Sequence, residues 1–186
     1  MVALASLLLV PSLDGTTAPA TVPDTAVLEF LGFRAGARLD ELTIHVLGIG
    51  GSRMRCRRSK VDLRVTECRA ALDAGKLGGP VELWVSAMDS LAGVITLSGV
   101  VAPEQLERWR DTLETRYGRV GARTQGTQSM LQWVRRGRML RLTWRLERGE
   151  KVASVSLVDG HVLDGWGRSR SVAGAGPRTQ PTSRTR

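Results

Sequence analysis

The sequence predicts an α+β domain in which two helix-plus-antiparallel-meander units pack together. A segment with apolar residues at helical spacing is followed by segments in which apolar and polar residues alternate, as they do in half-buried strands. The same succession then occurs a second time. With 42% hydrophobic and 24% charged residues over 186 positions, the chain has the composition of a globular protein and can bury a core.

The first unit is expected at residues 33–101. Its helix is predicted at residues 37–47, where Leu39 and Leu42 begin an apolar face and the glycines that follow end the helix. Alternation predicts three strands after it, and residues 93–101, which are continuously β-prone, predict a fourth. The alternating strands are marked by Met54 and Cys56, by Val61, Leu63 and Val65, and by Val81, Leu83 and Val85.

The second unit is expected at residues 102–166. Pro103 is suited to the first position of a helix and Gly118 to its end, so a helix is predicted between them. Gly137 marks the turn of a hairpin, and a further strand and a turn at Asp159 and Gly160 lead to a short segment ending at Trp166. These strands are predicted at residues 129–136, 138–146 and 151–158.

Residues 1–20 are predicted to be a signal peptide, because an apolar run at residues 2–10 is followed by Ala18, Pro19 and Ala20 in the A-x-A pattern of a cleavage site. No basic residue precedes the run, so a buried N-terminal strand or helix is the alternative. No segment of the sequence reaches the roughly 20 apolar residues of a transmembrane helix. We expect a periplasmic or secreted protein whose α+β domain occupies residues 21–167.

The two cysteines, Cys56 and Cys68, are expected to form a disulfide, since an even pair in an exported chain is most simply a bridge. Zinc binding is the alternative. It would need two more ligands, and His45 and His161 lack the paired spacing of a zinc site. We therefore expect no metal and no cofactor.

The formal net charge of +9 suggests an anionic partner, so the position of the charge matters. Residues 168–186 hold five arginines and no acid, and they contain almost no large apolar residue. This tail is expected to be disordered, because nothing in it can offset the entropy of ordering.

The hairpin of the second unit is the candidate binding face, because arginine and tryptophan are enriched at the energetic centres of interfaces. An ordinary solvated face of an amphipathic hairpin is the alternative. The candidate residues are Arg135, Arg136, Arg138, Arg141, Trp144 and Arg145.

No catalytic constellation is evident. The sequence contains no nucleophile elbow, zinc-protease motif or phosphate-binding loop. Asp159, His161 and Asp164 lie close together and could form an acid/base set, but Asp159 and Gly160 are typical turn residues, and His161 is expected to be a solvated residue after that turn. We therefore assign no catalytic residue.

The resemblance to known exported modules is architectural. It rests on residues 33–42 and on residues 113–118 followed by Trp133, residues 140–144 and residues 155–160. In this plan the chain resembles β-lactamase-inhibitor-protein-like modules and outer-membrane-assembly lipoproteins of the SmpA/OmlA kind. Such modules mostly bind other proteins, so the resemblance implies a binding role. The chain lacks the lipidated cysteine of those lipoproteins.

The leading functional hypothesis is an exported, non-catalytic binding module of the cell envelope, with an envelope protein or an anionic surface polymer as partner. The alternative is a basic nucleic-acid-binding protein of the cytosol, since arginines that neutralise phosphates release counterions and give affinity without sequence specificity. An enzyme with an unrecognised site is the third hypothesis, and His161 and Asp164 would be its only nominees.

Overall fold

The computed structural model describes residues 27–72 and 79–168. The predicted signal peptide lies outside these residues, and so does all of the predicted tail except its first residue. The described chain forms α1 (Leu39–Gly48), β1 (Arg55–Arg58), β2 (Val65–Leu72), β3 (Val81–Met88), β4 (Leu91–Val100), α2 (Pro103–Tyr117), β5 (Arg123–Gln125), β6 (Gln128–Arg135), β7 (Arg138–Glu147), β8 (Glu150–Asp159) and α3 (Gly160–Arg168).

All eight strands of the described chain form one antiparallel sheet, in the order β1-β2-β3-β4-β8-β7-β6-β5. Each half contributes a helix followed by four strands, and the last strands of the two halves, β4 and β8, pair at the centre. The predicted α+β class with two helix-and-meander units is confirmed. The sequence left open whether the halves share a sheet, and the pairing of β4 with β8 joins them into one.

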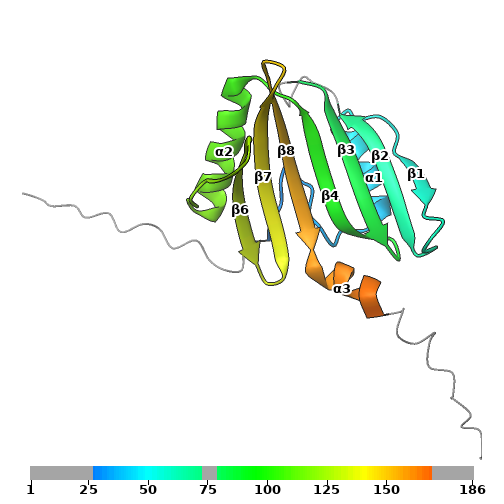
Figure 1. Ribbon diagram of the computed structural model, residues 1–186. Helices are drawn as coiled ribbons and strands as arrows, with labels where there is room; N and C mark the ends of the chain where they lie inside the picture. Colours follow the sequence, from blue (N-terminus) through cyan, green and yellow to red (C-terminus); the bar gives the residue numbers. More distant parts are fainter. Residues whose placement is uncertain (1–26, 73–78, 169–186) are drawn as a thin grey trace, which may run out of the picture.

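Both long helices lie on the same face of the sheet (Figure 1). Their buried side chains, among them Leu42 and Val46 of α1 and Leu113 of α2, form one core with the inward residues of the strands. The opposite face of the sheet carries no described helix, and α3 lies at the end of the sheet where β8 stops (Figure 1).

The start and end signals of α2 act as predicted. Pro103 occupies the first turn, and Gly118 follows the helix with φ of 89°, a conformation that favours glycine. The hairpin turn between β6 and β7 is also determined by its own residues. Arg136 and Gly137 both have positive φ, as the tight two-residue turns between antiparallel strands require. The helix and hairpin of the second half are therefore confirmed.

The strand predicted around Val61, Leu63 and Val65 is wrong except for its last residue. Val61 and Leu63 are 84% and 71% exposed, and β2 runs from Val65 to Leu72 instead. The segment before Val65 is a turn, because the Asp62 carboxylate accepts hydrogen bonds from both the backbone N–H and the guanidinium of Arg64. The inward residues of β2 are mostly small, which made its apolar signal weak.

Two further elements differ from the expectation. The short strand β5 lies outside the predicted strands, and all three of its residues are exposed. The final segment after Asp159 is the helix α3. Asp159 starts this helix as its N-cap, because its Oδ1 accepts the backbone N–H groups of His161 and Val162 at 3.0 and 3.4 Å.

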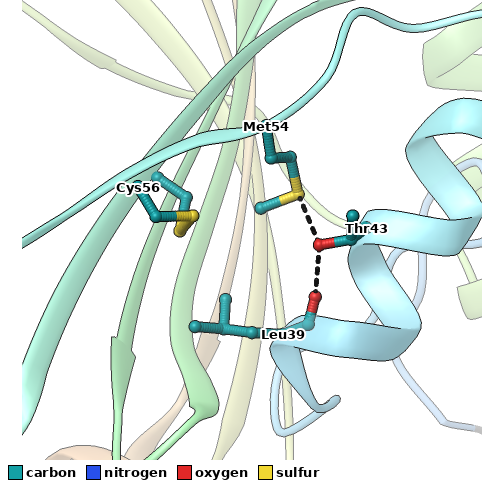
Figure 2. Close-up of a disulfide and its surroundings, with 5 residues drawn as sticks. Leu39, Thr43, Met54 and Cys56 are labelled. Atoms are coloured by element: carbon teal, nitrogen blue, oxygen red, sulfur yellow. Dashed lines mark hydrogen bonds between the residues drawn. A yellow bond between two sulfur atoms is a disulfide. The ribbon is translucent and has the colours of Figure 1, made fainter.

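The predicted disulfide between Cys56 and Cys68 is present. It joins directly opposed residues of β1 and β2 on the helix side of the sheet. Beside it, Met54 approaches α1, where the Thr43 hydroxyl donates to the carbonyl of Leu39 at 2.8 Å and contacts the Met54 sulfur at 3.6 Å (Figure 2). The bridge thus ties the edge strand β1 to the sheet and sets its register.

Candidate binding surface

The register of the sheet defines an open face, meaning the side opposite α1 and α2. Successive side chains of a strand point to opposite sides, and residues paired across strands point to the same side. Trp84 lies between the buried residues Leu83 and Val85, so it belongs to the open face. The row that contains it runs across seven strands as Arg55, Arg69, Trp84, Thr96, Ser156, Arg141 and Gln132.

Trp84 is the exposed aromatic residue of this face. It is 46% exposed, whereas Trp109 and Trp133 are 4% exposed and belong to the core. The Arg69 guanidinium lies 5.0 Å from the Trp84 ring centroid, within the range of a cation–π contact. A large apolar ring beside a positively charged group is the composition typical of interface hot spots.

The centre of the open face is made of small hydroxyl residues. Thr96 of β4 and Ser156 of β8 are paired, with their hydroxyl oxygens 3.3 Å apart. Ser98, Ser154 and Thr143 continue this polar strip in the neighbouring row. Small side chains allow another surface to approach the backbone closely, and the hydroxyls can donate or accept hydrogen bonds.

The charge of the open face is positive. Its described residues include seven arginines and four glutamates, and only two of each are joined in ion pairs, Arg57 with Glu67 at 3.6 Å and Arg145 with Glu147 at 2.8 Å. The arginines are Arg53, Arg55, Arg57, Arg69, Arg123, Arg141 and Arg145, and the glutamates are Glu67, Glu82, Glu147 and Glu150.

A pocket of about 570 Å³ lies at the β1 edge of the open face. Its floor is the β2 backbone around Ala71, whose side chain is small, so the taller neighbours leave a hollow. Three arginines and one glutamate surround it, namely Arg53, Arg55, Arg69 and Glu82.

The residues nominated from the sequence divide between the two sides of the sheet. Arg141 and Arg145 belong to the open face, where the Arg141 guanidinium donates to Gln132 Oε1 at 3.0 and 2.8 Å. Trp144 points to the helix side and packs against the core. The strand period separates Trp144 from its arginine neighbours, so the three do not form one surface.

The other three nominated arginines lie at the Gly137 turn, and the side chains of two of them make contacts that support the fold. Arg138 forms an ion pair with the buried carboxylate of Asp159 at 2.7 Å. Arg135 donates to the carbonyl of Tyr117 at 2.9 Å and lies 5.6 Å from the Tyr117 ring centroid. Arg136 is exposed in the turn itself, and its carbonyl accepts a hydrogen bond from His161 Nε2 at 3.1 Å.

The Asp159 carboxylate and the His161 imidazole near α3 also serve the fold, whereas Asp164 is exposed on α3. Both Asp159 oxygens are occupied, one by the N–H groups of the α3 start and the other by Arg138. His161 is exposed, and its imidazole forms a hydrogen bond with the Arg136 carbonyl in the Gly137 turn. These contacts give Asp159 the role of a helix cap and ion-pair partner.

Within the described ranges, no three His, Cys, Asp or Glu side chains are placed to hold a metal ion. None of the helices in that part of the chain combines the length and apolar character needed to cross a membrane.

Sequence reasoning missed Trp84 and the arginines of the β1 edge. A signal for Trp84 was available, because it alternates with Val81, Leu83 and Val85 and must therefore face away from the core. The arginines carried no such signal. Arg55 and Arg69 meet only through the pairing of β1 with β2.

Neither the known protein families, nor the curated proteins, nor the solved structures contain a significant match to this chain. The site must therefore be interpreted from its own geometry.

Proposed function

We propose that this protein is an exported, non-catalytic binding module that uses its open sheet face to bind an envelope protein with an acidic surface. The observation that carries the proposal is the open face itself, an eight-stranded surface with an exposed Trp84 beside Arg69 and with unpaired positive charge.

The size of the open face suits a specific complex. Strands lie about 4.8 Å apart and rise about 3.3 Å per residue, so eight strands of these lengths present roughly 1,000 Å² to a partner. A stable protein–protein interface of standard size buries about 800 Å² on each side. A surface of this extent can therefore hold one folded partner without help from other parts of the chain.

The chemistry of the face favours an acidic protein. Arginines outnumber glutamates on it, and complementary charge speeds association and selects the partner. Trp84 adds an apolar anchor next to this charge. A polymer recognised through charge alone would not need such an anchor, whereas tryptophan commonly dominates binding energy in protein interfaces.

The disulfide supports export, because such bonds persist in oxidising compartments and are rare in the reducing cytosol. The test is the intact mass of the native protein after thiol alkylation without reduction. We expect the mass of a chain cleaved near Ala20 with no alkyl groups. A full-length mass with two alkylated thiols would refute export and favour a cytosolic protein.

The binding role is tested by photo-crosslinking in the native host. A photoreactive phenylalanine replaces Ser156 at the centre of the open face or, as the matched control, Ile44 on the outer surface of α1, which is 72% exposed. We expect Ser156 to yield a cross-link to one acidic protein, Ile44 to yield none, and the yield to fall as salt screens the charges.

A second experiment combines Trp84→Ala with the photoreactive phenylalanine at position 156 and compares the cross-linking yields. Loss of a hot-spot tryptophan costs about 2 kcal/mol, which corresponds to roughly thirtyfold weaker binding. The proposal fails if Ile44 cross-links as well as Ser156, if Trp84→Ala leaves the yield unchanged, or if the cross-linked material is a polysaccharide or nucleic acid.

A further inference from the structure

We propose that the pocket lined by Arg53, Arg55, Arg69 and Glu82 is a carboxylate-binding site that receives an aspartate or glutamate side chain of the protein partner. This inference rests on the proposed function and names the group of the partner that is recognised.

The three arginines of the pocket outnumber its one glutamate, Glu82. Arg55 lies directly opposite Arg69, and Arg53 lines the same pocket. In the part of the chain that the structure describes, none of the three forms an ion pair. Like charges directly opposite each other on neighbouring strands are destabilising. A bound anion would remove this cost.

Protection of the sheet edge does not account for this arrangement. Charged side chains on edge strands prevent pairing with other chains, and the arginines of β1 can serve that purpose. Arg69 cannot, because it lies on β2, which is covered by β1 on one side and by β3 on the other. An arginine at this inner position adds to the charge of the pocket without shielding the edge.

The backbone of the Arg55–Arg69 pair and the guanidinium of Arg69 are held in position. The Cys56–Cys68 disulfide lies immediately next to the Arg55–Arg69 pair and locks the two strands in register. The ring of Trp84 supports the Arg69 guanidinium from one side at 5.0 Å. Groups that are already oriented lose less entropy on binding, which makes their hydrogen bonds more effective.

The ligand is expected to be a carboxylate and not a phosphate. The planar guanidinium fork can pair with two oxygens of either anion, and such charge-assisted hydrogen bonds are about twice as strong as neutral ones, so the rest of the pocket lining makes the choice. The fourth wall of the pocket is Glu82, whose negative charge opposes a dianion more than a monoanion. The small floor residue Ala71 leaves room for the arriving side chain.

The probe is a synthetic peptide with two glutamates in alternate positions, compared with the same peptide carrying glutamines and with inorganic phosphate. Binding is followed by the Nε–Hε resonances of the arginine side chains and by titration calorimetry. Arg55→Gln and Arg69→Gln remove one charge each, and Ala71→Leu fills the pocket without changing its charge. Arg119→Gln, at a side chain that is 92% exposed beyond α2, is the matched control for net charge.

We expect the glutamate peptide to shift the resonances of Arg53, Arg55 and Arg69, and each of the three pocket variants to weaken binding at least tenfold, with Arg119→Gln unchanged. Amide spectra of the variants verify that they fold. Equal binding of the glutamine peptide, tighter binding of phosphate, an equal effect of Arg119→Gln, or full binding by Ala71→Leu would each overturn the assignment.

The two proposals fail in different ways. If the probe at Ser156 captures its protein while Arg55→Gln leaves that capture unchanged, the carboxylate site is refuted and the binding module stands. If the glutamate peptide binds at the arginines but no protein is captured at Ser156, the open face is refuted as the binding surface.

Discussion

Removal of the disulfide tests how the edge strand is held. The double change Cys56→Ala with Cys68→Ala deletes a bridge between residues 12 apart in sequence. In the chain-entropy description, a loop of this length stabilises the folded state by about 3 kcal/mol, because it restricts the unfolded chain. Cys68 is fully buried, so the cavity left by its sulfur costs about 1 kcal/mol more.

Urea unfolding followed by tryptophan fluorescence measures this loss. Relative to the oxidised wild type, we expect the free energy of unfolding to fall by about 3 kcal/mol in the reduced wild type and by about 4 kcal/mol in the double variant. The slope against urea should rise in both, since an unlinked unfolded chain exposes more surface. Reductant added to the double variant is the control and should change nothing.

Hydrogen exchange locates the effect. All four residues of β1 are exposed, and among the described strands β1 pairs with β2 alone, so its attachment depends on the ladder to β2 and on the bridge. We expect the amides of β1 to exchange much faster after reduction while those of β4 and β8 follow the global stability. A loss below about 1 kcal/mol, or equal acceleration in β1 and β4, would refute this reasoning.

Two other predictions concern the N-terminal segment and α2. Gly36→Ala should destabilise the protein by about 2 kcal/mol or more in thermal unfolding, since Gly36 has φ of 86° and an added Cβ would lie 2.6 Å from Asp159 Oδ2. Gly121→Ala, where a Cβ meets nothing within 4 Å, should be nearly neutral. Burial raises the pKa of the Tyr117 phenol above its ordinary value of 10.0, so the free energy of unfolding should fall as pH rises above about 10, where the unfolded chain loses this proton first. Tyr117 is the only tyrosine, so the absorbance of phenolate reports its titration directly. The Tyr117→Phe variant should lose this part of the pH dependence of stability. A titration midpoint of the folded protein at or below pH 10 would contradict the raised pKa.

The elements that the sequence predicted well are those with local causes. Pro103 marks the start of α2, Gly118 marks its end, and Gly137 turns the chain between β6 and β7. Each of these residues acts through its own backbone preference. The strand around Leu63 was wrong because alternation alone cannot distinguish a strand from a turn held by a side chain such as Asp62. Local hydrogen bonds overrode the apolar pattern there.

The candidate site shows the same division. The outward orientation of Trp84 could be predicted, since buried side chains alternate with more exposed ones along most of β3 and this alternation is visible in the sequence. The nomination of Trp144 with Arg141 and Arg145 did not assemble into one surface, because the same period puts Trp144 on the helix side. The side of the sheet that a residue occupies is thus within reach of the sequence.

By itself, the sequence determined the α+β class, the repeated helix-and-meander plan and the disulfide pair, because composition, periodicity and the presence of only two cysteines are local or countable properties. Only the tertiary structure decided that β4 joins β8 in one sheet, that both helices cover the same face, and that Arg53, Arg55 and Arg69 surround one pocket. These facts depend on the register between strands distant in sequence. That register is set by the burial of the whole core and by the covalent bridge beside β1, which no local pattern contains.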